Sequence, residues 1–218
     1  VCGSCSTFCP SGALTTVGSD VTVEEVMEKI LDDKIFYDNS CGGVTVSGGE
    51  PLLQPGFVGA LLKRCKENGI HTAVETNLCV TRQTIDELVT LVDLWMCDLK
   101  FHDSRLHKQW TGAGNETIID NLRYLMSVTG NVIVRTTVIP GVNDDEEQIS
   151  RIAGLIKEAG DPLCYELLGF HVLGFDKYSS LGMVNPMEGY TEMPADRLVQ
   201  LRKIIEDTGL RTNYNHYE

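Results

Sequence analysis

The feature that most restricts the fold of this chain is a regular alternation of short β-branched runs with longer amphipathic segments. Strands are predicted over residues 43–47, 71–75, 92–99, 132–139 and 163–170. Helices are predicted over residues 22–33, 55–68, 81–91, 116–128, 144–159 and 194–208. Strands that recur roughly every 30 residues with helices between them are typical of βα units around a parallel sheet. Right-handed crossovers can wind such units into an open sheet or a barrel, and periodicity alone does not choose between them.

Polar residues gather where the predicted strands end. The first strand, residues 43–47, is predicted to be buried and runs into SGGEP. The next two strands end in ETN and DLK, and the fourth carries Arg135 and runs into PGVND. In barrels and in open α/β sheets, functional groups collect at the carboxyl ends of the strands. The sequence therefore predicts one shared site at this edge.

A cysteine loop opens the chain. Cys2, Cys5, Cys9 and Pro10 match the last three-quarters of the ferredoxin run C-x2-C-x2-C-x3-C-P, whose first cysteine would fall before Val1. Three thiolates at this spacing predict an iron–sulfur cluster. In two-cluster ferredoxins the fourth cysteine serves the other cluster, so Cys2 and Cys5 can hold one cube and Cys9 another. We therefore expect further protein upstream of Val1.

A structural zinc site is the alternative for this loop. Zinc sites usually combine two Cys or His pairs, and the remaining cysteines of this chain are isolated from one another. The Cys-Pro ending also favours an iron–sulfur cluster. Residues 1–18 are accordingly predicted to be the remnant of a ferredoxin-like insert, and residues 19–218 a partial barrel.

Charge and cysteine usage narrow the class of protein. The net charge of −13 would repel a phosphate backbone, so nucleic acid is an unsuitable partner. The chain has no apolar run of about 18 residues, so no membrane span is predicted. Eight cysteines without regular pairs argue against a secreted disulfide scaffold. Reduced thiols and a cluster indicate the cytoplasm of an organism that lives without oxygen.

The turn after the first strand is rich in glycine. Gly48 and Gly49 bring backbone close to a ligand, and their N–H groups can face a carboxylate. Glu50 adds an acceptor for an ammonium group. A site of these parts suits a zwitterionic amino acid such as methionine. The alternative is a tight βα turn in which glycine serves only the backbone geometry.

Together with the cysteine loop, six stretches resemble one family in its own order. They are CPSGAL, SCGGVTVSGGEPLLQPGF, GIHTAVETN, DLWMCDLK, RTTVIPGVND and FHVLGFDKYSSLG. The chain resembles the radical S-adenosylmethionine (SAM) enzymes that activate glycyl radical enzymes, of the pyruvate formate-lyase activating type. The resemblance implies a partial (β/α) barrel whose first strand lies upstream. It also implies a [4Fe–4S] cluster on an upstream CxxxCxxC, which cleaves SAM to a 5′-deoxyadenosyl radical that takes hydrogen from a glycine of the partner.

The resemblance assigns roles around the methionine part of SAM. Gly48, Gly49 and Glu50 match the turn that receives its amino group. Glu75 and Thr76 match an Asp-Thr pair that helps to bind a monovalent cation beside the SAM carboxylate. Glutamate in place of aspartate puts that cation in question, because the carboxylate reaches one methylene further.

Four further residues match the family. Arg135 matches a contact of SAM, and its guanidinium suits a carboxylate; its alternative is an ion pair with an acidic residue of a neighbouring strand. Asp98 and Lys100 match a D-x-K motif that holds the glycine-bearing peptide. His171 matches a histidine on the same face, although a lone histidine among apolar residues is often purely structural. The implied partners are a glycyl radical enzyme and a flavodoxin- or ferredoxin-type electron donor.

Two functions remain open at this point. The first is a glycyl radical enzyme activating enzyme, and residues 101–115 and 175–193 are predicted as the loops that choose its partner. The second is a non-catalytic iron–sulfur electron-transfer or binding protein on a barrel-like scaffold. Polar residues at successive strand ends favour the enzyme. Since the family's CxxxCxxC is absent from these 218 residues, this length of chain alone is expected to show no turnover.

Overall fold

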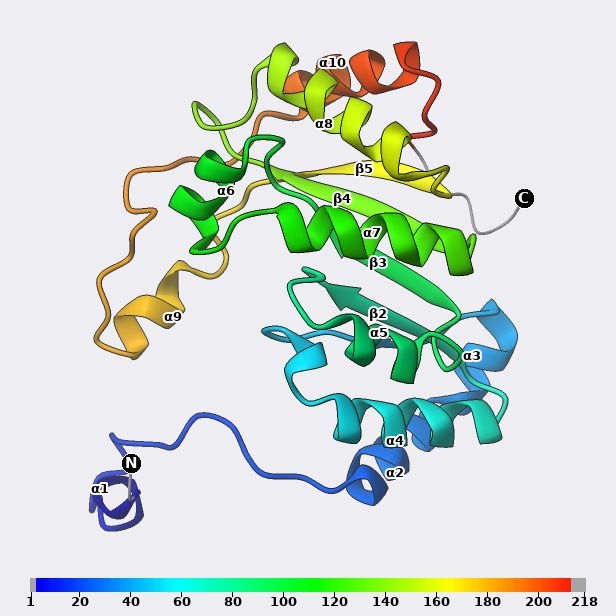
Figure 1. Cartoon of the computed structure of the whole chain (residues 1–218). Coiled ribbons are helices and arrows are strands. Elements are labelled where there is room, and N and C mark those ends of the chain that lie inside the picture. Colours follow the sequence, from blue (N-terminus) through cyan, green and yellow to red (C-terminus); the bar gives the residue numbers. More distant parts are fainter. Residues whose placement is uncertain (1–2, 213–218) are drawn as a thin grey trace.

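The computed structural model describes residues 3–212, which form a parallel sheet flanked by helices (Figure 1). The strands are β1 (Gly43–Val46), β2 (His71–Thr76), β3 (Leu94–Asp98), β4 (Val132–Val138) and β5 (Cys164–Gly169). Their order in the sheet is β1-β2-β3-β4-β5, and each pair of neighbours is parallel. A doubly wound sheet would reverse direction at a switch point. Strand order that follows chain order throughout is that of a partial barrel, as expected.

Helices cover one face of this sheet. Before β1 come α1 (Ser4–Thr7), α2 (Val23–Asp32) and α3 (Lys34–Ser40). Between strands lie η1 (Pro51–Leu53, a 3₁₀ turn), α4 (Pro55–Glu67), α5 (Arg82–Leu88), α6 (Ser104–Thr111), α7 (Glu116–Val128) and α8 (Glu146–Ala159). After β5 follow α9 (Phe175–Ser180) and α10 (Ala195–Asp207). In Figure 1, α4, α5 and α7 lie side by side in front of the strands.

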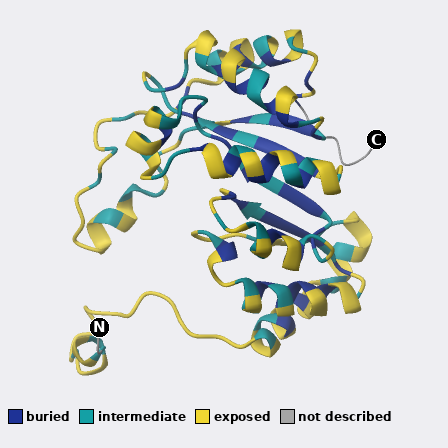
Figure 2. Ribbon diagram, in the orientation of Figure 1, coloured by how far each residue is buried: buried dark blue, intermediate teal, exposed yellow. Residues whose placement is uncertain are grey.

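The alternation of side chains along each strand separates a core face from a site face. On the core face, Trp95 and Tyr165 are fully buried among aliphatic residues that pack against the helices. Figure 2 shows this buried layer beneath the helices. The opposite face begins with a small apolar cluster (Ala73, Leu94, Ile133 and Cys164). Toward the carboxyl ends of the strands the same face becomes charged, and this change places the site.

Local sequence signals explain where the helices begin. Thr22 and Glu25 form a capping box at α2, in which the Glu25 amide donates to Thr22 Oγ1 over 3.2 Å and the Thr22 amide donates to Glu25 Oε2 over 2.7 Å. Thr81 and Asp145 cap α5 and α8 by accepting hydrogen bonds from the amides of Thr84 and Gln148. The helices predicted over residues 22–33, 55–68, 116–128, 144–159 and 194–208 are confirmed within two residues at each end.

The expectation that residues 43–47 are buried is wrong. Every residue of β1 is half-buried or exposed. In the described part of the chain β1 pairs with β2 only, so one of its edges has no strand beside it. β5 is the other edge strand of the sheet, but it is more deeply buried because α10 packs against it. The residues that α2 and α4 place near β1 cover its apolar side chains only partly.

The stretches predicted as loops contain helices. Asp103 caps α6 by accepting from the amides of Arg105 and Leu106, and Gly112 ends that helix with a φ of 90°. The second stretch contains α9. Both helices are shorter than the span over which apolar periodicity can be recognised, so the sequence did not reveal them.

The cysteine loop lies apart from the sheet (Figure 1). Residues 8–22 run from α1 to α2 largely exposed, with Phe8 and Val17 each 80% exposed. The division at residues 18 and 19 stays a prediction. Within residues 3–212, no helix combines the length and the apolar character that crossing a bilayer requires.

Candidate active site

A polar pocket of about 260 Å³ lies at the carboxyl edge of the strands. Eight residues predicted for the site line it together: Gly48, Gly49, Glu50, Glu75, Thr76, Asp98, Lys100 and Arg135. Ser47 and Asn77 also line it. Both belong to the polar strand ends SGGEP and ETN, although no individual role was predicted for either. The prediction of one shared site is thus confirmed, while the role of each residue stays a proposal.

Glu50 fastens the glycine turn to the end of β2. Its carboxylate accepts hydrogen bonds from Thr76 Oγ1 over 2.8 Å, from the Asn77 amide over 2.8 Å and from the Leu52 amide over 3.0 Å. A carboxylate has about four lone-pair sites, so one acceptor site of Glu50 is left for a ligand. Gly48, with a φ of 138°, adopts a backbone conformation that side chains disfavour.

Thr76 is a buried partner of this turn. The residue is 3% exposed, and its hydroxyl donates to Glu50 and accepts from the Leu78 amide over 3.0 Å. Both hydrogen-bonding functions of the hydroxyl are therefore used within the protein. Thr76 is placed to hold Glu50 in position beneath the pocket.

Arg135 forms an ion pair with an acidic residue of a strand in the same sheet, which was the alternative to its role as a SAM contact. Its Nη1 donates to Glu75 Oε1 over 2.8 Å, and its Nε lies 3.8 Å from Asp98 Oδ1. The Arg135 side chain is 12% exposed, and its Nε–H has no hydrogen-bond acceptor among the described residues. On the other side, Ser47 Oγ donates to Glu75 Oε2 over 2.7 Å. Arg135 thus pairs with β2 and lines the pocket, while its buried Nε–H stays without an acceptor in the part of the chain that the structure describes.

This pairing shifts the pKa of both groups. The hydrogen bond from Arg135 lowers the pKa of Glu75; burial opposes this shift, and the hydrogen bond from Ser47 adds to it. Burial acts to lower the pKa of Arg135, but Glu75 and the charges of Asp98 and Glu166 outweigh it and raise that pKa. Both groups are therefore ionised at neutral pH.

The Glu75–Arg135 pair makes stability depend on pH. Because the folded-state pKa of Glu75 lies below its unfolded value of about 4.3, its stabilisation is present above that value and is lost as the pH falls through the folded pKa. We expect Glu75→Gln to lower the free energy of unfolding at pH 7. Urea unfolding at several pH values should show the difference from wild type shrink as the pH falls below about 4.3. A difference that is the same at every pH would contradict this.

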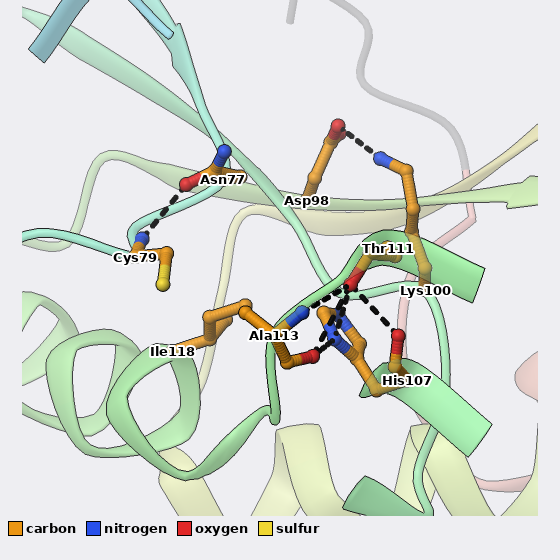
Figure 3. A pocket seen from close by; sticks show the side chains of 8 residues that line it. All are labelled: Asn77, Cys79, Asp98, Lys100, His107, Thr111, Ala113 and Ile118. Carbon is orange, nitrogen blue, oxygen red and sulfur yellow. Dashed lines mark hydrogen bonds and ion pairs between the residues drawn. The ribbon is translucent and has the colours of Figure 1, made fainter. Parts of the chain in front are cut away.

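Asp98 and Lys100 form a second ion pair at the pocket, with 2.6 Å between Lys100 Nζ and Asp98 Oδ2. Their side chains are 26% and 33% exposed, so both remain accessible from solvent. Figure 3 shows this pair among the side chains that line a smaller neighbouring pocket.

The charge balance of the polar pocket favours a cation that also carries a carboxylate. Three carboxylates line it (Glu50, Glu75 and Asp98) against two cations (Lys100 and Arg135). SAM has a sulfonium, an ammonium and one carboxylate, so its net charge is opposite to that of the pocket. The donor and acceptor set therefore fits SAM.

His171 lies in a different pocket. It follows β5, is exposed, and lines a space of about 550 Å³ together with Leu198, Arg202 and other residues of β5 and α10. The structure does not bring it together with Asp98 and Lys100. Gly169, also in this pocket, packs against α10, where an added Cβ would lie 3.0 Å from Leu198.

The cysteine loop offers a thiolate ligand. Backbone N–H groups at Leu14, Ser11 and Ala13 and the Ser11 hydroxyl surround Cys9, and the hydrogen bond at Leu14 contributes most to lowering the pKa of its thiol. Cys5 is exposed, and Cys2 lies outside the described residues. A thiol that ionises readily is what an iron–sulfur cluster requires. Within residues 3–212 no three acidic, His or Cys side chains converge as a metal site.

Cys41 is exposed and ends α3 with a φ of 53°. This left-handed backbone conformation is one that favours glycine.

Fold and site together define a partial (β/α) barrel with a polar ligand pocket at its carboxyl edge. A profile of the Radical SAM superfamily matches residues 2–153. The chain belongs to this superfamily, among the activating enzymes of glycyl radical enzymes.

Individual relatives support this assignment. Isethionate sulfite-lyase activating enzyme of Nitratidesulfovibrio vulgaris is 40% identical over 94% of this chain and 66% of its own length. Pyruvate formate-lyase 1-activating enzyme of Escherichia coli K12 is 34% identical over 88% of this chain and 79% of its own length. The structure of a domain of pyruvate-formate lyase-activating enzyme from Bacteroides vulgatus is 32% identical, with a TM-score of 0.66 over 80% of this chain and 99% of that domain. The chain spans 57–66% of the length of several curated relatives.

Proposed function

We propose that this chain is the SAM- and peptide-binding part of a glycyl radical enzyme activating enzyme. The observation that carries the proposal is the polar pocket, which joins the SGGE turn, the Glu75–Arg135 pair and the Asp98–Lys100 pair at one sheet edge. An electron carrier without a substrate would not need these charges at successive strand ends.

The radical SAM family implies a [4Fe–4S] cluster and SAM. When bound, the cluster supplies the electron that cleaves SAM to methionine and a 5′-deoxyadenosyl radical, which takes hydrogen from a glycine of the partner. The cysteine loop, through Cys2, Cys5 and Cys9, would hold accessory clusters. These clusters would receive electrons from a flavodoxin- or ferredoxin-type donor in the cytoplasm of an anaerobe.

The residues of the pocket would orient the methionine part of SAM. Glu50 has one free acceptor site for the ammonium group, and the amides of Gly48 and Gly49 line the approach. The guanidinium of Arg135, which lines the pocket, suits the SAM carboxylate. A monovalent cation at Glu75 would have to compete with Ser47 and Arg135, which already hold both carboxylate oxygens.

Asp98 and Lys100 would hold the main chain of the glycine-bearing peptide. Their paired charges can separate to give one acceptor and one donor for an extended peptide. His171 lines the separate pocket on β5 and α10. It can therefore contact the same peptide only at residues of that peptide that lie away from the Asp98–Lys100 pair.

SAM consumption tests the proposal. The protein as its gene encodes it would be reconstituted anaerobically with iron and sulfide and reduced with dithionite. We expect methionine and 5′-deoxyadenosine in equal amounts, and a glycyl radical signal in electron paramagnetic resonance after the partner is added. Reversible reduction without SAM consumption would instead identify the non-catalytic electron-transfer protein.

A further inference from the structure

A second, smaller pocket adjoins the polar pocket. It has a volume of about 210 Å³ and shares Asn77, Asp98 and Lys100 with the polar pocket. The other residues that line it are Cys79, His107, Thr111, Ala113 and Ile118. We call the space that these five residues border the side chamber. Figure 3 shows these side chains around one space, which the Asp98–Lys100 pair borders. A peptide held by that pair would therefore pass beside the chamber.

One wall of the side chamber is fixed by buried hydrogen bonds. His107 is 4% exposed, and its Nδ1 lies 2.7 Å from the Ala113 carbonyl and 2.9 Å from Thr111 Oγ1. Asn115, which is 2% exposed, donates through Nδ2 to the carbonyls of Phe101 and His102, each over 2.9 Å. The wall is consequently ordered before any ligand arrives, which reduces the entropy cost of binding.

The opposite wall is equally constrained. Leu78 is fully buried with a φ of 55°, a conformation that its own side chain disfavours. Asn121 of α7, which is 3% exposed, donates to the carbonyls of Leu78 over 3.0 Å and Val80 over 2.8 Å. Arg82 Nε in turn donates to Asn121 Oδ1 over 3.1 Å. These bonds hold the β2–α5 loop in a strained shape that presents Cys79 to the chamber.

The chemistry of the chamber suits an apolar group. The ring Nδ1 of His107 and the hydroxyl of Thr111 are already bonded within the wall. Ile118, Ala113 and the Cys79 side chain supply apolar surface. The two charged lining residues, Asp98 and Lys100, are paired with each other. A cavity of about 150 Å³ accommodates a benzene ring, so this volume can hold one large side chain.

We propose that the side chamber binds an apolar side chain, up to the size of an aromatic ring, next to the glycine in the partner's peptide. The proposal rests on the proposed function and adds a specificity determinant to it. Two segments set the shape of this subsite: α6 with the turn to α7, and the β2–α5 loop. The charged groups of SAM find their counterparts in the polar pocket and not in this subsite.

Filling the chamber tests the proposal. Cys79→Phe places a ring in it, and Ala113→Leu narrows it from the other wall. Val128→Phe, at the far end of α7 and 47% exposed, is the matched control for adding a phenyl group. One peptide substrate would carry the partner's glycine with its natural flanking residues. In the other peptides, alanine would replace one flanking residue at a time. Thermal unfolding of every variant would verify the fold.

KM for the peptide and Kd for SAM, both measured on the anaerobically reconstituted protein, should then distinguish an effect on peptide binding from an effect on SAM binding. We expect Cys79→Phe and Ala113→Leu to raise KM for the natural peptide about 10- to 100-fold. KM for the peptide with alanine at the apolar flanking position should change less than threefold, and Kd for SAM should stay within twofold. Val128→Phe should match wild type.

Other results would overturn the proposal in recognisable ways. A weaker Kd for SAM without a change in peptide KM would assign the chamber to the adenosine part of SAM. Equal losses for every peptide would mean that the chamber takes no flanking side chain. Failure of wild type to consume SAM would refute the proposed function instead, and this outcome is seen before any variant is compared.

Discussion

Gly43→Ala is expected to detach β1 from the sheet and to abolish SAM binding. An added Cβ at Gly43 would lie 2.0 Å from the carbonyl oxygen of His71, its partner in β2. A backbone atom cannot move aside as a flexible side chain can, so the two strands would have to separate. The SGGE turn follows β1 directly and depends on this register. We expect a loss of about 4 kcal/mol or more in the free energy of unfolding, among the largest single-substitution effects.

Gly42→Ala is the matched control. An added Cβ there meets the Ser40 hydroxyl at 2.9 Å, and this side chain can rotate away. We expect Gly42→Ala to cost less than about 1 kcal/mol and to bind SAM as wild type does. Urea unfolding and equilibrium dialysis with labelled SAM would measure both quantities. Equal stability of the two variants would show that β1 tolerates a wider spacing from β2.

Arg135→Gln should weaken SAM binding about 10- to 100-fold, because a hydrogen bond to a charged group contributes about 1.5–3 kcal/mol. It should also lower the free energy of unfolding by about 1–3 kcal/mol, because Glu75 loses its cation in a site that is only partly exposed. The two effects have different origins. Equilibrium dialysis with labelled SAM measures the first, and urea unfolding measures the second.

Two further variants distinguish these origins. In Glu75→Gln, Arg135 keeps its charge but loses its ion-pair partner, so stability should fall while SAM affinity is largely retained. Arg123→Gln removes an exposed arginine that pairs with Asp120 on α7, and neither property should change measurably. If Arg135→Gln lost stability but bound SAM as wild type does, Arg135 would be a structural residue, as its alternative reading states.

Much of the fold could be predicted because the signals are local. Helix α7 was predicted over residues 116–128 and lies there, since its apolar period is regular and Gly114 precedes it. Strand β4 is continuously β-branched and was predicted one residue too long. The polar strand ends were predicted to meet, because parallel strands share one carboxyl edge.

Pairing across the sheet could not be predicted from the sequence. The distance from Arg135 to Glu75 depends on register, since Glu75 faces Met96 and Asp98 faces Arg135. His171 illustrates the same point, because the path of the chain after β5 sends it to another pocket. The side chamber depends on Asn121, which no motif indicates and which acts on a loop 41 and 43 residues away in the chain.

The sequence by itself determined the parallel βα order, the family and the set of residues at the strand ends, because periodicity, turn residues and motifs are encoded locally. Only the tertiary structure decided which of those charges neutralise one another, which donors remain free, and where a second pocket opens. Hydrogen bonds and ion pairs act over a few ångströms between residues that lie far apart in the chain. Their partners are therefore set by how the strands and helices pack.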